Sequence, residues 1–313
     1  MPFSDDAALM LEGLNAGFPQ VESMNGPQAR AAVLARKQRP ATQVQVDRVE
    51  QMDIPGPGGA LPIRIYTPQG SKGADALPAI VFAHGGGFVF CDLDTHDEFC
   101  RVMANGASAV IVSVDYRLAP EHPAPAAALD LYAALEWTIA DSARLGIDPG
   151  QVIVAGDSAG GNLAAVTSLM ARDQGGPELA GQVLLYPVIS DDFQTESYEK
   201  FATGYFNTRA AMQWYWEQYA PTEIRQGIAP HLLSPARAET LEGLPPAIVV
   251  TAACDPLSDE GSHYAKSLHA AGVPTIHRHY EDIFHGFMTI PSLGITQTAR
   301  SALWSDLIRI LQR

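Results

Sequence analysis

The sequence predicts an α/β fold in which helices flank a mostly parallel sheet of eight strands. One observation is a series of short runs rich in β-branched and apolar residues, at 46–49, 61–66, 79–83, 110–114, 152–155, 182–186, 247–252 and 275–280. The other is that longer segments of helical composition lie between these runs, among them 124–140, 161–172, 259–271 and 297–311. Such alternation is typical of a doubly wound sheet.

The expected strands differ in how polar they are. Residues 79–83 read Ala-Ile-Val-Phe-Ala and residues 152–155 read Val-Ile-Val-Ala. Strands that are apolar throughout are buried on both faces, as in the centre of a parallel sheet. The first two runs alternate with polar residues and include Pro62, which suits an antiparallel hairpin at one edge.

Two segments do not follow the alternation. Residues 1–45 have helical composition and precede the first strand, and residues 189–233 interrupt the pattern with many aromatic side chains. We expect both to form one cap over a core of residues 46–188 and 234–313. Insertions after strands lie over the carboxyl edge of such a sheet, where ligands bind. Phe206, Trp214 and Tyr215 are therefore candidate pocket walls, although clustered aromatics also serve as internal packing.

Composition and charge narrow the class of protein. The 313 residues are 47% hydrophobic and carry a formal net charge of −15, which disfavours binding to nucleic acid or anionic lipid. The chain opens on acidic residues without a signal-peptide pattern and has no run of about 18 apolar residues. Three scattered cysteines favour free thiols over a zinc site or a disulfide framework. We expect a cytoplasmic protein without metal, cofactor or stable membrane association, and a homodimer is compatible with the sequence.

The strongest local motif is Gly156-Asp157-Ser158-Ala159-Gly160-Gly161, between an apolar run and a helical pattern. A G-x-S-x-G motif at a strand-to-helix turn is a nucleophile elbow, which exposes the serine hydroxyl at a helix N-terminus. The alternative is a glycine-rich turn with a serine cap. A second motif, His84-Gly85-Gly86-Gly87, ends an apolar strand upstream. Its presence favours the nucleophile elbow over the glycine-rich turn.

The glycines of the second motif point to acyl transfer. Backbone N–H groups stabilise the oxyanion of the transition state, and glycine lets the backbone approach it closely. We expect Gly85, Gly86 and Ala159 to supply these donors. His84 precedes the serine, whereas this order of motifs places the base last, so we expect His84 to hold the loop.

A serine nucleophile needs a base and an acid that orients the base. His285 follows the last expected strand in a loop, whereas the other downstream histidines include two in a helical pattern and two in a strand. Asp255 lies nearest the end of the preceding strand and is the expected acid, although Asp before Pro is also a common helix cap. Asp259 and Glu260 are alternatives that we expect in the first turn of the next helix.

Together these motifs resemble the bacterial hormone-sensitive lipase family of carboxylesterases. The resemblance rests on residues 84–87, 116–123, 156–161, 255–261 and 285–287, in family order. It implies the α/β-hydrolase fold with a helical cap, a triad of Ser158, Asp255 and His285, and cleavage of short acyl esters without a cofactor. Ser258 and Cys91 depart from the family pattern, outside the reacting groups.

Other functions remain as alternatives to an esterase. An amidase or an acyltransferase would use the same triad. A non-catalytic receptor on this fold typically has a defective triad, whereas all three residues are present here. A metal-dependent hydrolase is disfavoured because no His, Asp and Glu cluster has ligand spacing.

Overall fold

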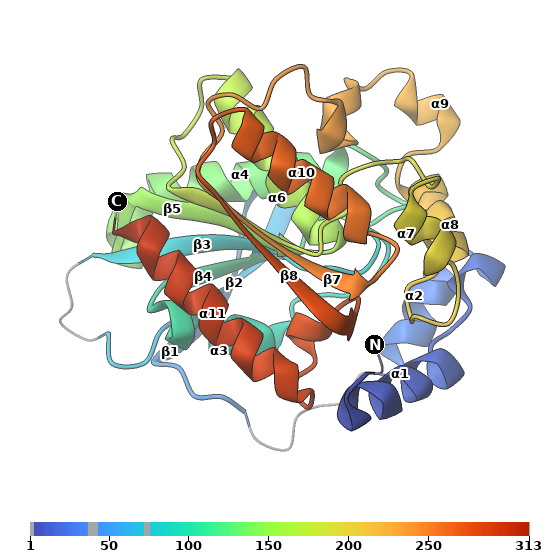
Figure 1. Cartoon of the computed structure of the whole chain (residues 1–313). Helices are drawn as coiled ribbons and strands as arrows, with labels where there is room; N and C mark the ends of the chain where they lie inside the picture. The colour runs from blue at the N-terminus through green and yellow to red at the C-terminus, as the bar shows by residue number, and fades with distance from the viewer. Residues whose placement is uncertain (1–2, 37–42, 72–75, 313) are drawn as a thin grey trace.

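The computed structural model describes residues 3–36, 43–71 and 76–312. Its centre is an eight-stranded sheet with the order β1-β2-β4-β3-β5-β6-β7-β8 (Figure 1). The strands are β1 (Arg48–Gly56), β2 (Gly59–Thr67), β3 (Leu77–Ala83), β4 (Val110–Val114), β5 (Ile147–Asp157), β6 (Gly181–Leu185), β7 (Ala247–Cys254) and β8 (Thr275–Phe284). β2 pairs antiparallel with β1 and β4, and the remaining pairs are parallel. The predicted α/β fold is confirmed.

Helices cover both faces of the sheet (Figure 1). The longer ones are α1 (Asp5–Gly17), α2 (Gly26–Leu34), α3 (Asp97–Ala107), α4 (Ala126–Ala140), α6 (Ala159–Asp173), α8 (Arg209–Tyr219), α10 (Ser258–Ala270) and α11 (Gly294–Leu311). The short ones are α5 (Ser142–Leu145), α7 (Glu196–Lys200) and α9 (Thr222–Arg225), with 3₁₀ turns at Val21–Ser23, Pro230–Leu232, Pro235–Arg237 and Phe287–Thr289. α3 and α11 pack on one face, and α4, α6 and α10 on the other.

The apolar strands are buried on both faces because each face contacts a different layer of helices. In β3, Val81 belongs to the hydrophobic cluster beneath α4 and α6. Its neighbours Ile80 and Phe82 belong to the cluster beneath α3 and α11. Side chains alternate across a strand, so a continuous apolar sequence supplies both clusters.

The edge hairpin forms as predicted, but it is longer than its sequence pattern. β1 was expected at residues 46–49, whereas the strand begins at Arg48 and continues to Gly56, paired with Gly59. Most of its side chains are partly or fully exposed. Apolar periodicity therefore could not mark the rest of this strand, which is held by backbone pairing with β2.

The N-terminal helices lie beside the segment that contains α7 and α8 (Figure 1). The Asn15 side chain donates to the Gly204 carbonyl at 2.8 Å and accepts from the Phe206 N–H at 3.0 Å. The Trp214 indole N–H donates to the Met24 carbonyl at 3.0 Å. These contacts join segments almost 200 positions apart. Residues 37–42 of the expected N-terminal part of the cap lie outside the described residues.

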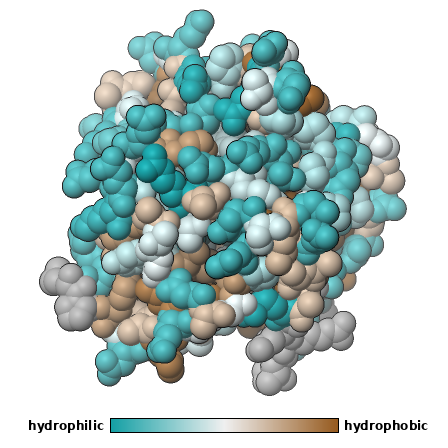
Figure 2. All heavy atoms as spheres, turned by 90° about the vertical axis from the view of Figure 1, so that its right-hand side faces the viewer, coloured by the Kyte–Doolittle hydropathy of each residue, from teal (hydrophilic) through white to brown (hydrophobic). Residues whose placement is uncertain are grey.

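Figure 2 shows the molecule from the side of α1, α2 and α8, where hydrophilic side chains surround smaller hydrophobic areas. The large hydrophobic side chains that are exposed in the described parts of the chain lie on different elements: Leu9, Val49, Leu129 and Ile308. Within those same parts, no helix combines the length and the apolar character that a bilayer crossing needs.

Candidate active site

Four parallel strands end at the same edge of the sheet, and the candidate residues follow them directly. His84 comes after β3, Ser158 after β5, Asp255 after β7 and His285 after β8. The carboxyl edge of a parallel sheet is the usual ligand-binding edge of such folds. All four side chains are buried.

Ser158 adopts a backbone conformation that is rare for a residue other than glycine. Its φ and ψ angles are 56° and −117°, at the turn between β5 and α6. The turn is so tight that a Cβ at Gly156 would collide with the Gly160 carbonyl, and one at Gly160 with the Ala83 carbonyl. Both flanking positions therefore require glycine, and the strained turn presents Ser158 at the N-terminus of α6.

Ser158, His285 and Asp255 form a continuous hydrogen-bonded chain. His285 Nε2 lies 2.9 Å from Ser158 Oγ, and His285 Nδ1 lies 2.6 Å from Asp255 Oδ2. An ionised carboxylate can only accept, so Nδ1 carries the proton and Nε2 is left to accept from the serine hydroxyl. The ring of Tyr186 packs edge-on against the His285 ring, with 4.9 Å between the ring centres, and helps to hold it in place.

The other acidic candidates have different partners. Asp255 Oδ1 accepts from the Leu257 N–H at 3.0 Å, so this carboxylate also shapes the turn before α10. Asp259 accepts from the Ser197 N–H at 2.8 Å. Both Asp259 and Glu260 lie in the first turn of α10, as expected.

Gly85 does not have a free N–H group, contrary to its predicted role as an oxyanion donor. Its N–H donates to Asp157 Oδ1 at 2.8 Å, across 72 residues of sequence. In the described parts of the chain, the N–H groups of Gly86, Gly87 and Ala159 have no such partner. Because a donor that is already bound cannot receive an oxyanion, Gly87 replaces Gly85 as the second candidate on this loop.

His84 holds the glycine loop from behind. Its Nδ1 lies 2.7 Å from the Gly85 carbonyl oxygen, and its ring stacks on Tyr116 with 4.4 Å between the ring centres. Burial, assisted by the neighbouring His96, lowers the pKa of His84 to about 4. A neutral buried imidazole with this contact is a structural residue rather than a base, as the sequence order suggested.

Asp157 is a buried anion next to the nucleophile. Its Oδ1 lies 3.2 Å from His96 Nε2, in addition to the bond from Gly85. Burial alone would raise the pKa of Asp157, but His96 and the Gly85 N–H more than offset it, so the pKa lies below the usual value. Asp157 is therefore a carboxylate.

Two of the three predicted pocket aromatics line a cavity of about 330 Å³ between α1 and α8. Phe206 stacks edge-on against Phe18, and its ring would be 3.8 Å from a Cβ at Gly286, next to the candidate base. Tyr215 packs so closely on Gly87 that a Cβ there would collide with its ring. Trp214 does not line this cavity, because its indole is bonded to Met24 between the two segments.

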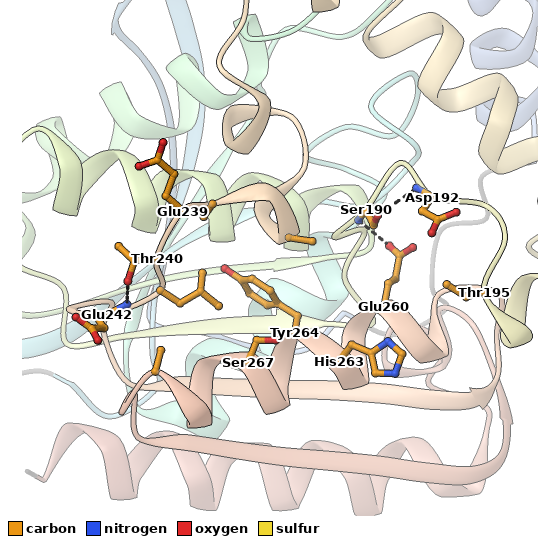
Figure 3. Close-up of a pocket in the computed structure, with 14 residues that line it drawn as sticks. Ser190, Asp192, Thr195, Glu239, Thr240, Glu242, Glu260, His263, Tyr264 and Ser267 are labelled. Atoms are coloured by element: carbon orange, nitrogen blue, oxygen red, sulfur yellow. Dashed lines mark hydrogen bonds between the residues drawn. The ribbon is translucent and has the colours of Figure 1, made fainter.

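A separate groove of about 490 Å³ lies along α10 and does not include the triad (Figure 3). At one end, Glu260 Oε1 accepts from the N–H groups of Ile189 and Ser190, at 2.6 and 3.3 Å. Burial raises the pKa of Glu260 well above its ordinary value. Glu260 thus fastens the chain after β6, which contacts the elbow through the Val188 N–H and the Ser158 carbonyl.

Four residues of this region were not predicted from the sequence: Gly87, Asp157, Tyr186 and His96. Gly87 and Asp157 lie inside the recognised motifs, so their signal was present, but only the fold shows which N–H is occupied. Tyr186 follows an apolar strand and His96 precedes a helix, and nothing in their local sequence distinguishes them.

Known proteins with similar sequences identify the family of this chain. A family described by the α/β hydrolase fold matches residues 80–289. The chain belongs to this α/β-hydrolase family. It is 45% identical to the carboxylic ester hydrolase LipN of Mycobacterium tuberculosis, over 82% of this chain and 68% of that protein. It is 44% identical to the esterase LipI of the same organism, over 84% of this chain and 81% of that protein.

A solved structure agrees with these relatives. The hyperthermophilic esterase of the archaeon Pyrobaculum calidifontis superimposes with a TM-score of 0.89 at 38% identity, over 99% of this chain and 100% of that one. The resemblance to hormone-sensitive lipase-like carboxylesterases is confirmed, and this α/β hydrolase is a serine ester hydrolase.

Proposed function

We propose that this α/β hydrolase cleaves short-chain acyl esters through a covalent acyl-enzyme on Ser158. The observation that carries the proposal is the hydrogen-bonded chain from Ser158 Oγ through His285 to Asp255. It connects a nucleophile, a base and an orienting acid within hydrogen-bonding distance, which is the geometry that acyl transfer requires.

In the first half of the reaction, Ser158 Oγ attacks the ester carbonyl carbon while its proton passes to His285 Nε2. The tetrahedral intermediate collapses, the ester C–O bond breaks, and the imidazolium returns the proton to the leaving alcohol. In the second half, water attacks the acyl carbonyl carbon while its proton passes to His285 Nε2. The bond from that carbon to Ser158 Oγ then breaks, the acid leaves, and the imidazolium returns the proton to Ser158 Oγ. Asp255 stabilises the imidazolium and fixes which nitrogen carries the proton.

The N–H groups of Gly86, Gly87 and Ala159 would receive the developing oxyanion. They lie on the two turns that flank the nucleophile, and Ala159 begins a helix of 15 residues whose N-terminus favours negative charge. Each such donor lowers the barrier by roughly 3 kcal/mol.

The cap would set the range of acyl and alcohol groups. The 330 Å³ cavity is bounded by Phe206 and Tyr215, each next to a loop of the catalytic edge. The exposed large hydrophobic side chains are scattered over α1, β1, α4 and α11, which offers little surface for an oil interface. Both features favour soluble esters with chains of roughly four to eight carbons over emulsified triglycerides.

A panel of p-nitrophenyl esters from acetate to palmitate tests this function, with triolein emulsion and p-nitroanilides of the same acids alongside. We expect kcat/KM to peak among the short esters, with little turnover of anilides. A peak on triolein would contradict the substrate class. Faster anilide cleavage would indicate an amidase, and binding without turnover would indicate a receptor.

We also propose that the enzyme works in a reducing compartment such as the cytoplasm. Cys91, Cys100 and Cys254 form no disulfide with one another, and burial raises the pKa values of the Cys100 and Cys254 thiols. Fractionation of the native host followed by detection with an antibody would test this location, and recovery outside the cytoplasm would contradict it.

A further inference from the structure

The carboxylate that precedes the nucleophile connects the two halves of the oxyanion site. Asp157 is the last residue of β5, and its Oδ1 accepts the Gly85 N–H at 2.8 Å. Gly85 in turn precedes Gly86 and Gly87, the candidate donors. A single oxygen atom therefore joins the nucleophile elbow to the glycine loop.

His96 faces Asp157 and Thr95 with its two ring nitrogens. Its Nε2 faces Asp157 Oδ1 at 3.2 Å, and its Nδ1 lies 3.1 Å from Thr95 Oγ1. The Thr95 hydroxyl donates its own proton to the Asp92 carbonyl, so towards His96 it can only accept. Both ring nitrogens of His96 therefore face acceptors.

The glycine loop needs such an anchor because its own conformation is unusual. Gly86, Gly87 and Phe88 have φ angles of 117°, 57° and 65°, three successive residues in the left-handed half of conformational space. Strained backbone of this kind persists only where its surroundings hold it. The hydrogen bond from the Gly85 N–H to Asp157 fixes the start of this stretch to the turn that contains Ser158.

Charge matters at this position as well as geometry. The oxyanion would form on the substrate bonded to Ser158, one residue from a buried carboxylate. An unpaired anion there would oppose the negative charge of the transition state, so the contacts of Asp157 with His96 and with the Gly85 N–H matter for the reaction as well as for the fold.

We propose that Asp157 and His96 act as a pair of positioning residues, in which His96 holds the Asp157 carboxylate and that carboxylate sets the Gly86 and Gly87 N–H groups relative to Ser158. This inference rests on the proposed esterase function. Neither side chain touches the reacting atoms, so their effect is expected in the transition state more than in substrate binding.

The test uses Asp157→Asn, which removes the carboxylate charge with little change of shape, and His96→Gln, which replaces the ring with an amide that can still donate a hydrogen bond. The matched control is Asp306→Asn, a fully buried aspartate on α11 that pairs with Arg278 Nη2 at 2.8 Å, near the amino end of β8. For each variant, kcat and KM for p-nitrophenyl butyrate are measured, together with inhibition by a butyl boronic acid, which mimics the tetrahedral intermediate.

We expect both site variants to lose at least about tenfold in kcat, with KM changed less than about threefold and boronate affinity falling in parallel with kcat/KM. The Asp306 variant should keep its kcat. The Asp157→Asn/His96→Gln double variant should lose less than the product of the two single losses, because residues that act as a pair are not additive.

The proposed role of Asp157 and His96 would be overturned by an unchanged kcat in folded variants. It would also be overturned by a change in KM alone, or by strictly additive losses of kcat. An equal kcat loss in the Asp306 control would overturn it as well. If one site variant does not fold, the other tests the same contact. An inactive wild-type enzyme would overturn the proposed function instead, so the two failures are distinguishable.

Discussion

Asp255 uses its two carboxylate oxygens for different purposes, one for His285 and the other for the turn before α10. Asp255→Asn keeps the turn contact but presents His285 with an amide, which disturbs the imidazole tautomer. We expect kcat to fall by about 10³-fold or more with little loss of stability. Steady-state kinetics on p-nitrophenyl butyrate, with thermal unfolding alongside, would measure both effects.

Asp259→Asn is the control for this change. Asp259 carries a different contact, to the Ser197 N–H, and its replacement should cost far less in kcat. The reverse ranking of the two variants would assign the role of the acid to Asp259.

His84 makes stability dependent on pH. Its pKa is about 4 in the folded protein and about 6.5 in a freely solvated histidine. The unfolded chain therefore binds this proton more tightly, so the folded protein loses stability as the pH falls from about 6.5 towards 4. The loss attributable to His84 is on the order of 3 kcal/mol.

Chemical denaturation of wild type and His84→Gln at several pH values between 4 and 7 would check this. The variant should show a flatter dependence of the free energy of unfolding on pH. Parallel curves for the two proteins would rule out His84 as the cause.

Residue roles were predictable from the sequence where a local motif carries them. They were not predictable where a contact between distant residues determines them. Ser158 and His285 were identified from short motifs and strand order. Gly85 was predicted as an oxyanion donor, whereas in the structure its N–H is bound by Asp157, 72 residues away. No local pattern reports that bond.

The strand-to-helix turn between β5 and α6 is the element on which the site depends. Gly160 lies against the Ala83 carbonyl without room for a Cβ, whereas Gly13 in α1 has nothing within 4 Å of that position. Gly160→Ala should therefore shift the elbow and reduce both kcat and stability. Gly13→Ala should raise the free energy of unfolding by about 0.5–1 kcal/mol, because alanine favours the helix.

Denaturation curves and esterase assays of the two variants would measure the contrast. A Gly160→Ala enzyme with wild-type kcat would contradict the tight turn. A destabilised Gly13→Ala enzyme would contradict the open environment of Gly13.

The elements themselves were largely predictable where they are buried. The inner strands were recognised because they are apolar on both faces, as β3 is between its two clusters. α3 was not among the helices singled out from the sequence. β1 was predicted too short because its exposed side chains carry no apolar signal.

The contact between the two distant segments that we propose as a cap is a property of the whole molecule. Asn15 in α1 and Met24, just before α2, contact the segment that contains α8, and neither residue lies in a recognisable motif. Both segments were expected outside the core because they do not follow the alternation of strands and helices, and a position over the carboxyl edge was expected because residues 189–233 follow a strand. Only the fold separates aromatics that line the cavity from Trp214, which joins the two segments.

The aromatic side chains of this region should respond differently to truncation. Phe206→Ala and Tyr215→Ala open the cavity wall, so they should extend activity to longer chains while short-chain activity persists. Two substrates that differ by one methylene in such a pocket differ by about 1–3 kcal/mol in transition-state binding. Trp214→Ala removes a buried contact and should cost about 3–5 kcal/mol of stability, lowering all activities together.

Melting temperatures and chain-length profiles of the three variants would decide the assignment. If each variant loses stability and the profile stays fixed in all of them, the cap aromatics serve packing alone and do not select the substrate.

The proposed mechanism depends most on Ser158 Oγ as the atom that carries the acyl group, and a p-nitrophenyl alkylphosphonate tests this directly. Such a reagent bonds irreversibly to an activated serine, and mass spectrometry of the digested protein locates the adduct. We expect one phosphonyl group per chain, on the peptide that contains Ser158, with activity lost in step and no adduct in Ser158→Ala. An adduct on another residue that tracks the loss of activity, or full activity in Ser158→Ala, would contradict the account.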